Sequence, residues 1–187
     1  MSVHARHLPL PELVPEQEFL TGYIMTVFGP VEFRTWKKQI ERIDDLLKLS
    51  GAEAMFQRLS LAKRFEEEKL AAEKKNRPAT TMSSDAQANY QRRCSQALRC
   101  VLAQTLLADD LQCAYNSCAR AFACRLTESQ LLQKFCKLDH LEDLKIPGKS
   151  QLQRYGQWLP EEDMRRIVDT LLASAIAVDE DSAAPAD

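Results

Sequence analysis

Glycine and histidine are scarce in this chain of 187 residues, and each shortage excludes a class of chemistry. The five glycines do not form a loop that could wrap a phosphate group. The tripeptide at 148–150, Gly-Lys-Ser, matches the end of a P-loop, but no predicted strand and no earlier glycine precede it. A cysteine nucleophile would lack a base, because the three histidines lie in the irregular N-terminus or in a predicted loop: His4, His7 and His140. We therefore expect no enzymatic activity.

Long apolar runs and a strong charge of one sign are also missing. The longest apolar clusters, such as residues 23–28, are far shorter than the ~20 residues that cross a membrane. The N-terminus has no apolar core of the kind that a signal peptide needs. The formal net charge is −2, so any nucleic-acid binding would need a local basic patch. We expect no membrane association and no small-molecule substrate.

Six cysteines raise the question of a zinc site: Cys94, Cys100, Cys113, Cys118, Cys124 and Cys136. Structural zinc sites usually pair cysteines two to four residues apart on a turn. Here Cys113, Cys118 and Cys124 are separated by four and five residues, and Cys94 and Cys100 by five, inside predicted helices. A small buried thiol packs well among alanines, and in a reducing compartment it does not form a disulfide. Acidic pairs such as Asp109-Asp110 are explained by helix capping. The sequence thus predicts no metal and no cofactor.

Helix-favouring residues fill most of the chain, and β-branched runs are few. The predicted fold class is all-α: an N-terminal helical arm or hairpin, then a small orthogonal helical bundle with a helix-turn-helix-like segment. We expect an irregular N-terminus at 1–14, the arm at 15–75, a linker at 76–84, the bundle at 85–177 and an acidic disordered tail at 178–187.

The arm contains a narrow apolar seam. After Pro30, which suits the first turn of a helix, large apolar residues recur at steps of three and four: Phe33, Trp36, Ile40, Ile43 and Leu47. Such a seam suits pairing with another helix, so we expect it to form an interface, either in a homodimer or with another protein. Residues 63–75 mix charges of both signs, which is typical of a solvated helix or a coiled-coil surface.

Capping residues predict where the helices of the bundle begin. Ser84 with Gln87, and Thr127 with Gln130, have the spacing of a capping box, and Ser150 is a predicted cap. The last helix should begin at Pro160. It carries the clearest apolar stripe in the chain: Met164, Ile167, Val168, Leu171, Leu172 and Ile176.

The stretch 145–160 is the strongest candidate for a binding element. Its Pro147-Gly148 turn leads into a short helix rich in amide and guanidinium groups, which suit contacts to base edges and phosphates. The alternative is that this segment only connects two helices of a bundle. The candidate DNA contacts are Lys145, Lys149, Ser150, Gln151, Gln153, Arg154 and Tyr155. Further candidate phosphate contacts are Arg92, Arg93 and Arg99.

The region from about 94 to 172 resembles the InsH-like N-terminal helical domain of bacterial insertion-sequence transposases. The resemblance rests on four segments in order: 97–102, 122–129, 132–139 and 146–155. In the third, Lys137 stands where glycine is usual. The fourth, Ile-Pro-Gly-Lys-Ser-Gln-Leu-Gln-Arg-Tyr, is the most specific, although Gln151 and Tyr155 stand where threonine and phenylalanine are common.

This resemblance implies a DNA-binding module that recognises the ends of a transposable element. Related transposases cut DNA with a strand-rich core that holds metal ions through three carboxylates. The chain is expected to lack that core, so it would position double-stranded DNA and not cut it. A bacterial cytoplasmic protein, associated with the nucleoid when bound to DNA, is the expected setting. The alternative is a helical protein–protein interaction or assembly module that binds no nucleic acid.

Overall fold

The computed structural model describes residues 13, 31–107, 115–138 and 145–183. Seven helices make up this described part of the chain, and it contains no strand. The predicted all-α class is confirmed. The predicted helix at 15–28 lies outside the described residues.

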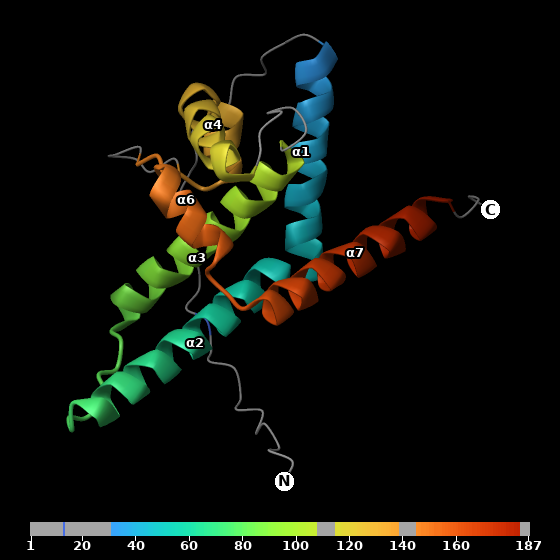
Figure 1. The fold of residues 1–187 in the computed structure, drawn as a ribbon. Helices are drawn as coiled ribbons and strands as arrows, with labels where there is room; N and C mark the ends of the chain where they lie inside the picture. The colour runs from blue at the N-terminus through green and yellow to red at the C-terminus, as the bar shows by residue number, and fades with distance from the viewer. Residues whose placement is uncertain (1–12, 14–30, 108–114, 139–144, 184–187) are drawn as a thin grey trace.

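Helices α1 (Val31–Ser50) and α2 (Ala52–Lys74) meet at Gly51 and diverge from it (Figure 1). Gly51 has φ 65° and ψ 13°, a left-handed conformation that glycine adopts without strain. The Ser50 hydroxyl accepts a hydrogen bond from the amide of Ala52 at 3.2 Å. The break after α1 therefore follows from the Ser50-Gly51 pair.

Helix α3 (Ser84–Leu106) is the central element of the molecule. It packs along α2 on one side and against α6 and α4 on another. Most of its buried residues are small or aliphatic, including Cys94, Ala97 and Leu98, and the exceptions are Gln91 and Arg99. Small side chains allow neighbouring helices to approach closely, which places α3 among several partners.

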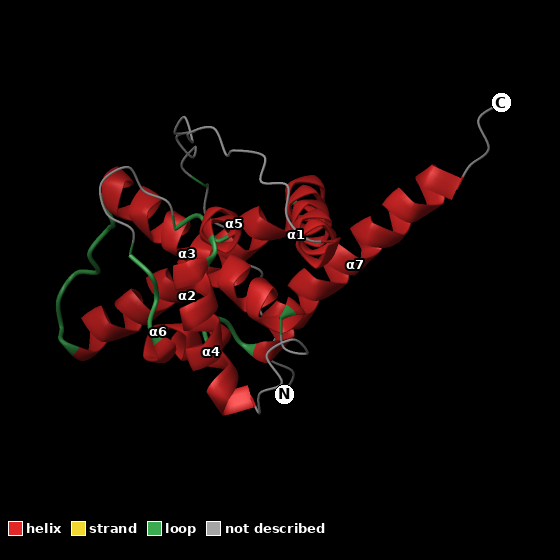
Figure 2. Cartoon of the chain, turned by 90° about the horizontal axis from the view of Figure 1, so that it is seen from above, coloured by secondary structure: helices red, strands yellow, loops and turns green. Residues whose placement is uncertain are grey.

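Three shorter helices follow: α4 (Tyr115–Glu128), α5 (Gln130–Phe135) and α6 (Lys149–Gly156). α4 packs against both α5 and α6, and α5 also reaches α1. Phe122 and Leu126 of α4 are fully buried. Helix α7 (Glu161–Ala183) then crosses α1 and α2, and its C-terminal half extends away from the other helices (Figure 2).

The core runs continuously through residues on both sides of 76–84. Leu47 and Phe56 belong to the same buried cluster as Leu98, Phe122 and Ile167. The segment 76–83 is thus the connection between α2 and α3 and does not separate two cores. The expected tail at 178–187 is also wrong in part, because α7 continues to Ala183.

The predicted helix caps are each displaced by one or two residues. Ser83 caps α3, accepting a hydrogen bond from the Ala86 amide, and Ser129 caps α5 in the same way through Leu132. Thr127 remains inside α4, where its hydroxyl donates to the carbonyl of Ala123. Gly148, not Ser150, is the cap residue of α6. The predicted cap at Asp109 or Asp110 lies outside the described residues.

A candidate nucleic-acid interface

Helix α6 is attached to the body by one side only. Leu152 and Tyr155 are buried, with exposed fractions of 2% and 3%, and the helix packs against α3 and α4. Pro147, just before the helix, is buried as well. A helix of eight residues is about 12 Å long, which is close to the width of the major groove of B-DNA.

The other side of α6 faces solvent. It carries five of the predicted contact residues, all exposed: Lys149, Ser150, Gln151, Gln153 and Arg154. Lys145, which is also exposed, lies four residues before the helix begins. The Arg154 Nε donates to the carbonyl of Ser150 at 3.2 Å, and the Gln151 Nε2 donates to the Tyr155 hydroxyl at 2.6 Å. The structure therefore brings together the residues predicted for this stretch, except Tyr155.

Tyr155 anchors the helix and does not present a binding surface. Its ring meets the indole of Trp158 edge-on, with ring centroids 5.7 Å apart. Burial raises the pKa of the Tyr155 hydroxyl, although the hydrogen bond from Gln151 and the charge of Arg93 act in the opposite direction. Its prediction as a DNA contact is wrong, because the side chain is needed in the core.

Arg99 is likewise wrongly predicted as a phosphate contact. Its side chain is 3% exposed, and its guanidinium lies 2.8 Å from a carboxylate oxygen of Glu53 and 2.6 Å from one of Asp44. It also donates to the backbone carbonyl of Phe135 at 3.0 Å. Lys137 adds a second cation, 2.9 Å from the other carboxylate oxygen of Glu53. This buried ion network joins α1, α2 and α3 to the end of α5.

Arg92 and Arg93 lie about two turns before Arg99 on α3, and their surroundings differ from each other. Arg93 is exposed, and its charge acts on the pKa of Tyr155, so it lies near α6. Arg92 is partly buried and donates a hydrogen bond to the side chain of Asn89. Arg93 extends the basic surface of α6 onto α3, whereas the guanidinium of Arg92 is hydrogen-bonded to Asn89 of its own helix.

Charge is unevenly distributed over the described helices. From residue 86 of α3 to residue 160, the described part of the chain has ten lysines and arginines and one acidic residue, Glu128. Five more acidic residues of this region, at 109, 110, 139, 142 and 143, lie outside the described residues. By contrast, α7 contains seven acidic residues and two arginines. Counting charge by helix would have revealed this basic surface from the sequence, whereas the net charge hides it.

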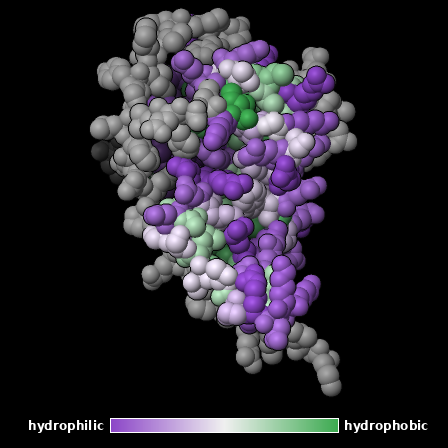
Figure 3. Space-filling view, turned by 90° about the vertical axis from the view of Figure 1, so that its left-hand side faces the viewer, coloured by the Kyte–Doolittle hydropathy of each residue, from purple (hydrophilic) through white to green (hydrophobic). Residues whose placement is uncertain are grey.

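An aromatic group borders the basic surface where α2, α3 and the end of α6 meet. The rings of Tyr90 and Trp158 lie 5.9 Å apart, and the guanidinium of Arg64 lies 4.9 Å from the centre of the Tyr90 ring. Lys63 donates to the carbonyl of Trp158 at 2.9 Å. Figure 3 shows that this side of the molecule, at the left of Figure 1, is mainly hydrophilic with small apolar patches. The sequence reasoning did not identify these α2 residues.

The apolar seam of α1 is used inside the chain. Ile40 and Leu47 are buried, and Trp36 and Ile43 pack against the same core. The side chain of Phe33 lies outside the described part. Ile40 and Leu47 are therefore not available to a second chain, which corrects the prediction for these two residues. Trp36 and Ile43 are only partly buried, and for them the predicted interface stays a prediction.

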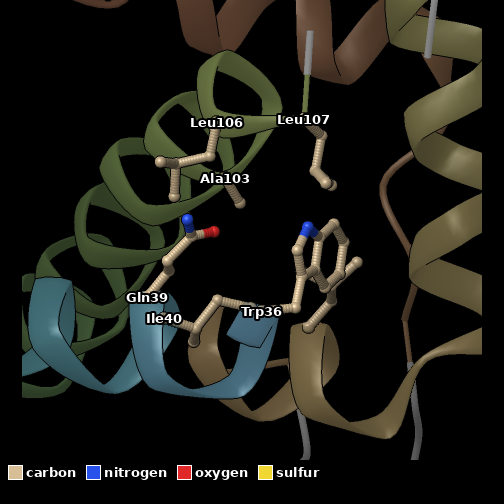
Figure 4. A pocket seen from close by; sticks show the side chains of 7 residues that line it. Trp36, Gln39, Ile40, Ala103, Leu106 and Leu107 are labelled. Atoms are coloured by element: carbon tan, nitrogen blue, oxygen red, sulfur yellow. The ribbon is translucent and has the colours of Figure 1, made fainter. Parts of the chain in front are cut away.

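A small apolar hollow lies between the start of α1 and the end of α3. Trp36, Gln39 and Ile40 face Ala103, Leu106 and Leu107 across it (Figure 4). Its free volume is about 10 Å³, which is the lower limit for a single water molecule. This hollow has no room for an organic ligand.

The cysteines and acidic residues show no metal-binding arrangement among the described residues, where no group of three or more potential ligands occurs. Cys94, Cys100 and Cys136 are buried, and Cys124 is exposed. Burial raises the pKa of Cys94 to about 11, which keeps it a neutral thiol. Cys113 and the side chain of Cys118 lie outside the described part.

No family model, no curated protein and no solved structure matches the chain. Within the described residues, no helix is both long and apolar enough to cross a membrane. The features of the molecule that point to a function are the geometry and charge of α6 and its surroundings.

Proposed function

We propose that this chain is a helical DNA-binding module that places α6 against double-stranded DNA. The observation that carries the proposal is the two-sided character of α6. One side is anchored by Leu152 and Tyr155, and the other exposes lysine, arginine, serine and glutamine. A short rigid helix with this composition suits insertion into a major groove.

The residues of α6 divide into two roles in this proposal. Lys149 and Arg154, with Lys145 and Arg93 beside them, neutralise phosphates and hold the helix in place. Gln153 offers an amide group, which can pair with the edge of adenine, whereas the amide nitrogen of Gln151 already donates to the Tyr155 hydroxyl. Ser150 is a further hydrogen-bonding group. The resemblance to transposase N-terminal domains supports a role in recognising element ends, with cleavage left to a separate catalytic core.

The electrostatic environment supports this assignment. Exposed cations on α6 and α3 face solvent in a part of the described structure that contains a single acidic residue. Arg93, Lys149 and Arg154 are exposed, so their side chains can reach the phosphates of a bound duplex.

The proposal is tested by fluorescence anisotropy with labelled duplex DNA over a series of salt concentrations. The variant Lys149→Glu/Arg154→Glu should lose at least tenfold in affinity, because two phosphate contacts become repulsive. The logarithmic salt dependence should also become shallower by about one unit for each lost contact. Gln153→Ala should reduce the preference for one sequence over another while leaving binding to random DNA nearly unchanged.

A matched control comes from α1. Arg34 and Lys38 are exposed and lie one turn apart, so Arg34→Glu/Lys38→Glu makes the same change in net charge on a helix that does not pack against α6. The control should alter binding far less than the α6 variant. Equal losses for both variants would show that only net charge matters, and no binding by the wild type at low salt would refute DNA binding altogether.

A helical assembly module is the second candidate function. The observation that favours it is the exposed apolar surface of α7, where Leu172 and Ile176 are 56% and 60% exposed. The two functions are compatible, because they use different helices.

A further inference from the structure

Two cations of α2, Lys63 and Arg64, lie beside the C-terminal end of α6. The Nζ of Lys63 donates to the carbonyl of Trp158 at 2.9 Å, and Trp158 follows the last residue of α6 by two positions. The guanidinium of Arg64 lies 4.9 Å from the centre of the Tyr90 ring, which itself lies 5.9 Å from the indole of Trp158. These contacts hold both cations close to α6, although 95 residues separate Lys63 from Trp158.

Arg93 links these cations to the basic surface of α6. It lies three residues after Tyr90 in α3, a spacing at which residues are neighbours on a helix surface. Burial raises the pKa of Tyr155 in α6, and the charge of Arg93 acts against this rise. Arg93 and Arg64 are exposed, and Lys63 is partly buried. Because α3 packs against both α6 and α2 (Figure 1), the positive surface continues from α6 across α3 to α2.

Given the proposed DNA-binding function, on which this step rests, we propose that Lys63 and Arg64 bind the phosphate backbone of the duplex whose major groove receives α6. A helix in a groove has phosphates on its flanks, so cations of a neighbouring helix can hold it in place. The C-terminal end of a helix also carries partial negative charge, which repels phosphate unless cations lie beside it. Lys63 and Arg64 supply these cations at the C-terminal end of α6.

Neither cation is neutralised by the contact that holds it. Lys63 donates to a carbonyl, which is a neutral acceptor, so two of its three N–H donors remain for a phosphate. Arg64 lies over the face of an aromatic ring, a contact that orders the guanidinium without using its N–H donors. An ordered arginine loses less conformational freedom when it binds a phosphate.

Of the three glutamates that follow Arg64 in α2, one acts on this surface. Glu68 already forms an ion pair at 2.9 Å. Glu66 lies about 200° round the helix from Arg64, on a nearly opposite side. Burial raises the pKa of Tyr90 to about 12, and the charge of Glu67 raises it further, which places Glu67 near this ring. Glu67 therefore opposes phosphate binding in part, and its removal should strengthen binding.

The acidic first turn of α7, which follows Trp158 closely, is partly paired within its own helix. Glu161 and Asp163 lie 3.1 and 3.8 Å from arginines of α7. Among the described residues, Glu67 and Glu162 are thus the acids near this surface without an ion pair. The three cations Lys63, Arg64 and Arg93 outnumber them, so the surface stays positive.

The aromatic residues favour a duplex over a single strand. Single strands bind by stacking their bases on free aromatic faces. Here Tyr90 has Arg64 over its ring, and the indole of Trp158 contacts the rings of Tyr90 and Tyr155 at 5.9 and 5.7 Å. These rings order the cations and are engaged with one another, which suits contacts to phosphates and not to unpaired bases.

Fluorescence anisotropy of the full chain with labelled duplex DNA tests the contact. Arg64→Gln should weaken binding about threefold and Lys63→Gln/Arg64→Gln about tenfold, with a salt dependence shallower by about one unit for each lost contact. Arg58→Gln/Lys69→Gln is the matched control, because both residues are exposed on α2 and lie about half a turn from the Lys63–Arg64 pair. It makes the same change in net charge and should stay within about twofold of the wild type. Glu67→Gln should strengthen binding about twofold, a gain that a folding defect cannot produce.

The outcomes separate this contact from the role of α6. A wild type that binds no duplex at low salt would remove both. Loss in Lys149→Glu/Arg154→Glu without loss in Lys63→Gln/Arg64→Gln would overturn the α2 contact alone, whereas the reverse would support it and overturn the role of α6. Equal losses in the α2 variant and its control, or an unlabelled single strand that competes as well as the duplex, would also overturn the α2 contact. Circular dichroism should show wild-type helix content in every variant.

Discussion

Arg99 shows that a charged residue has a structural role, and not a binding role, when its side chain is buried with charged partners. In the sequence it is one of three arginines on a helix with few acids nearby, and that pattern predicts a phosphate contact. In the structure its guanidinium is enclosed by two carboxylates and a carbonyl from three other parts of the chain. The partners Asp44 and Glu53 are 55 and 46 residues away in the sequence, so no local pattern could have identified them.

The Arg99 network should make the fold sensitive to acid. Burial favours the neutral form of Glu53, but hydrogen bonding and charge from Arg99 prevail, with Lys137 adding to them, and lower its pKa from 4.5 to about 2. The stabilisation from Glu53 is therefore fully present above pH ~4.5 and is lost as the pH falls towards 2. Its size is on the order of 3 kcal/mol. Urea unfolding at pH 7 and at pH 3 should show this loss in the wild type.

Glu53→Gln separates this effect from general acid destabilisation. The variant should be less stable at pH 7 by about 3–5 kcal/mol, because Arg99 remains buried beside a neutral partner. It should then lose less stability between pH 7 and pH 3 than the wild type does. Glu41→Gln is the control, since Glu41 forms an exposed pair with Lys37 at 3.6 Å; such pairs contribute about 0–1 kcal/mol. Equal pH dependence in the wild type and Glu53→Gln would contradict the assigned pKa.

At the scale of single helices, the sequence predicted which segments are helical better than where each begins. Serine and threonine both cap helices, and neighbours such as Ser83 and Ser84 have equal intrinsic suitability. The backbone decides between them: Ser83 has an extended conformation and Ser84 is already helical. The same applies to α6. The sequence shows its exposed amide and guanidinium groups, but the burial of Tyr155 depends on the packing of α6 against α3 and α4.

A substitution at the junction of α1 and α2 tests the effect of backbone strain on stability without a steric clash. Gly51 is left-handed, yet an added Cβ would meet nothing within 4 Å, so substitution causes strain without a clash. Gly51→Ala should lower the free energy of unfolding by about 1 kcal/mol. Gly148 offers the matched control, because its φ is −75° and it also has open space around it. Gly148→Ala should cost less than Gly51→Ala in the same urea titration, because the lower entropy of the unfolded alanine variant offsets part of the poorer capping by alanine. Equal effects at both positions would contradict the argument.

For the whole molecule, the two halves expected from the sequence share one core. The segment 76–84 has the composition of a linker, and composition alone could not show that helices on either side pack together. Arg77 also pairs with Glu68 at 2.9 Å, which ties the start of the connection to α2. The separation of charge is visible at this scale too, with the basic surface around α6 and the acidic helix α7 in one chain.

A single core predicts that the chain unfolds as one unit even when its connection is cut. A protease recognition site inserted after Thr81 should be cleavable, because this connection is exposed. The two fragments should then remain associated at native pH, since Leu47 and Phe56 pack in one cluster with residues that follow the cut. Calorimetry should show one transition before and after cleavage, at a lower temperature afterwards because the cut removes a covalent constraint on the unfolded chain. Fragments that separate on gel filtration, or two independent transitions in the uncut protein, would instead establish two domains.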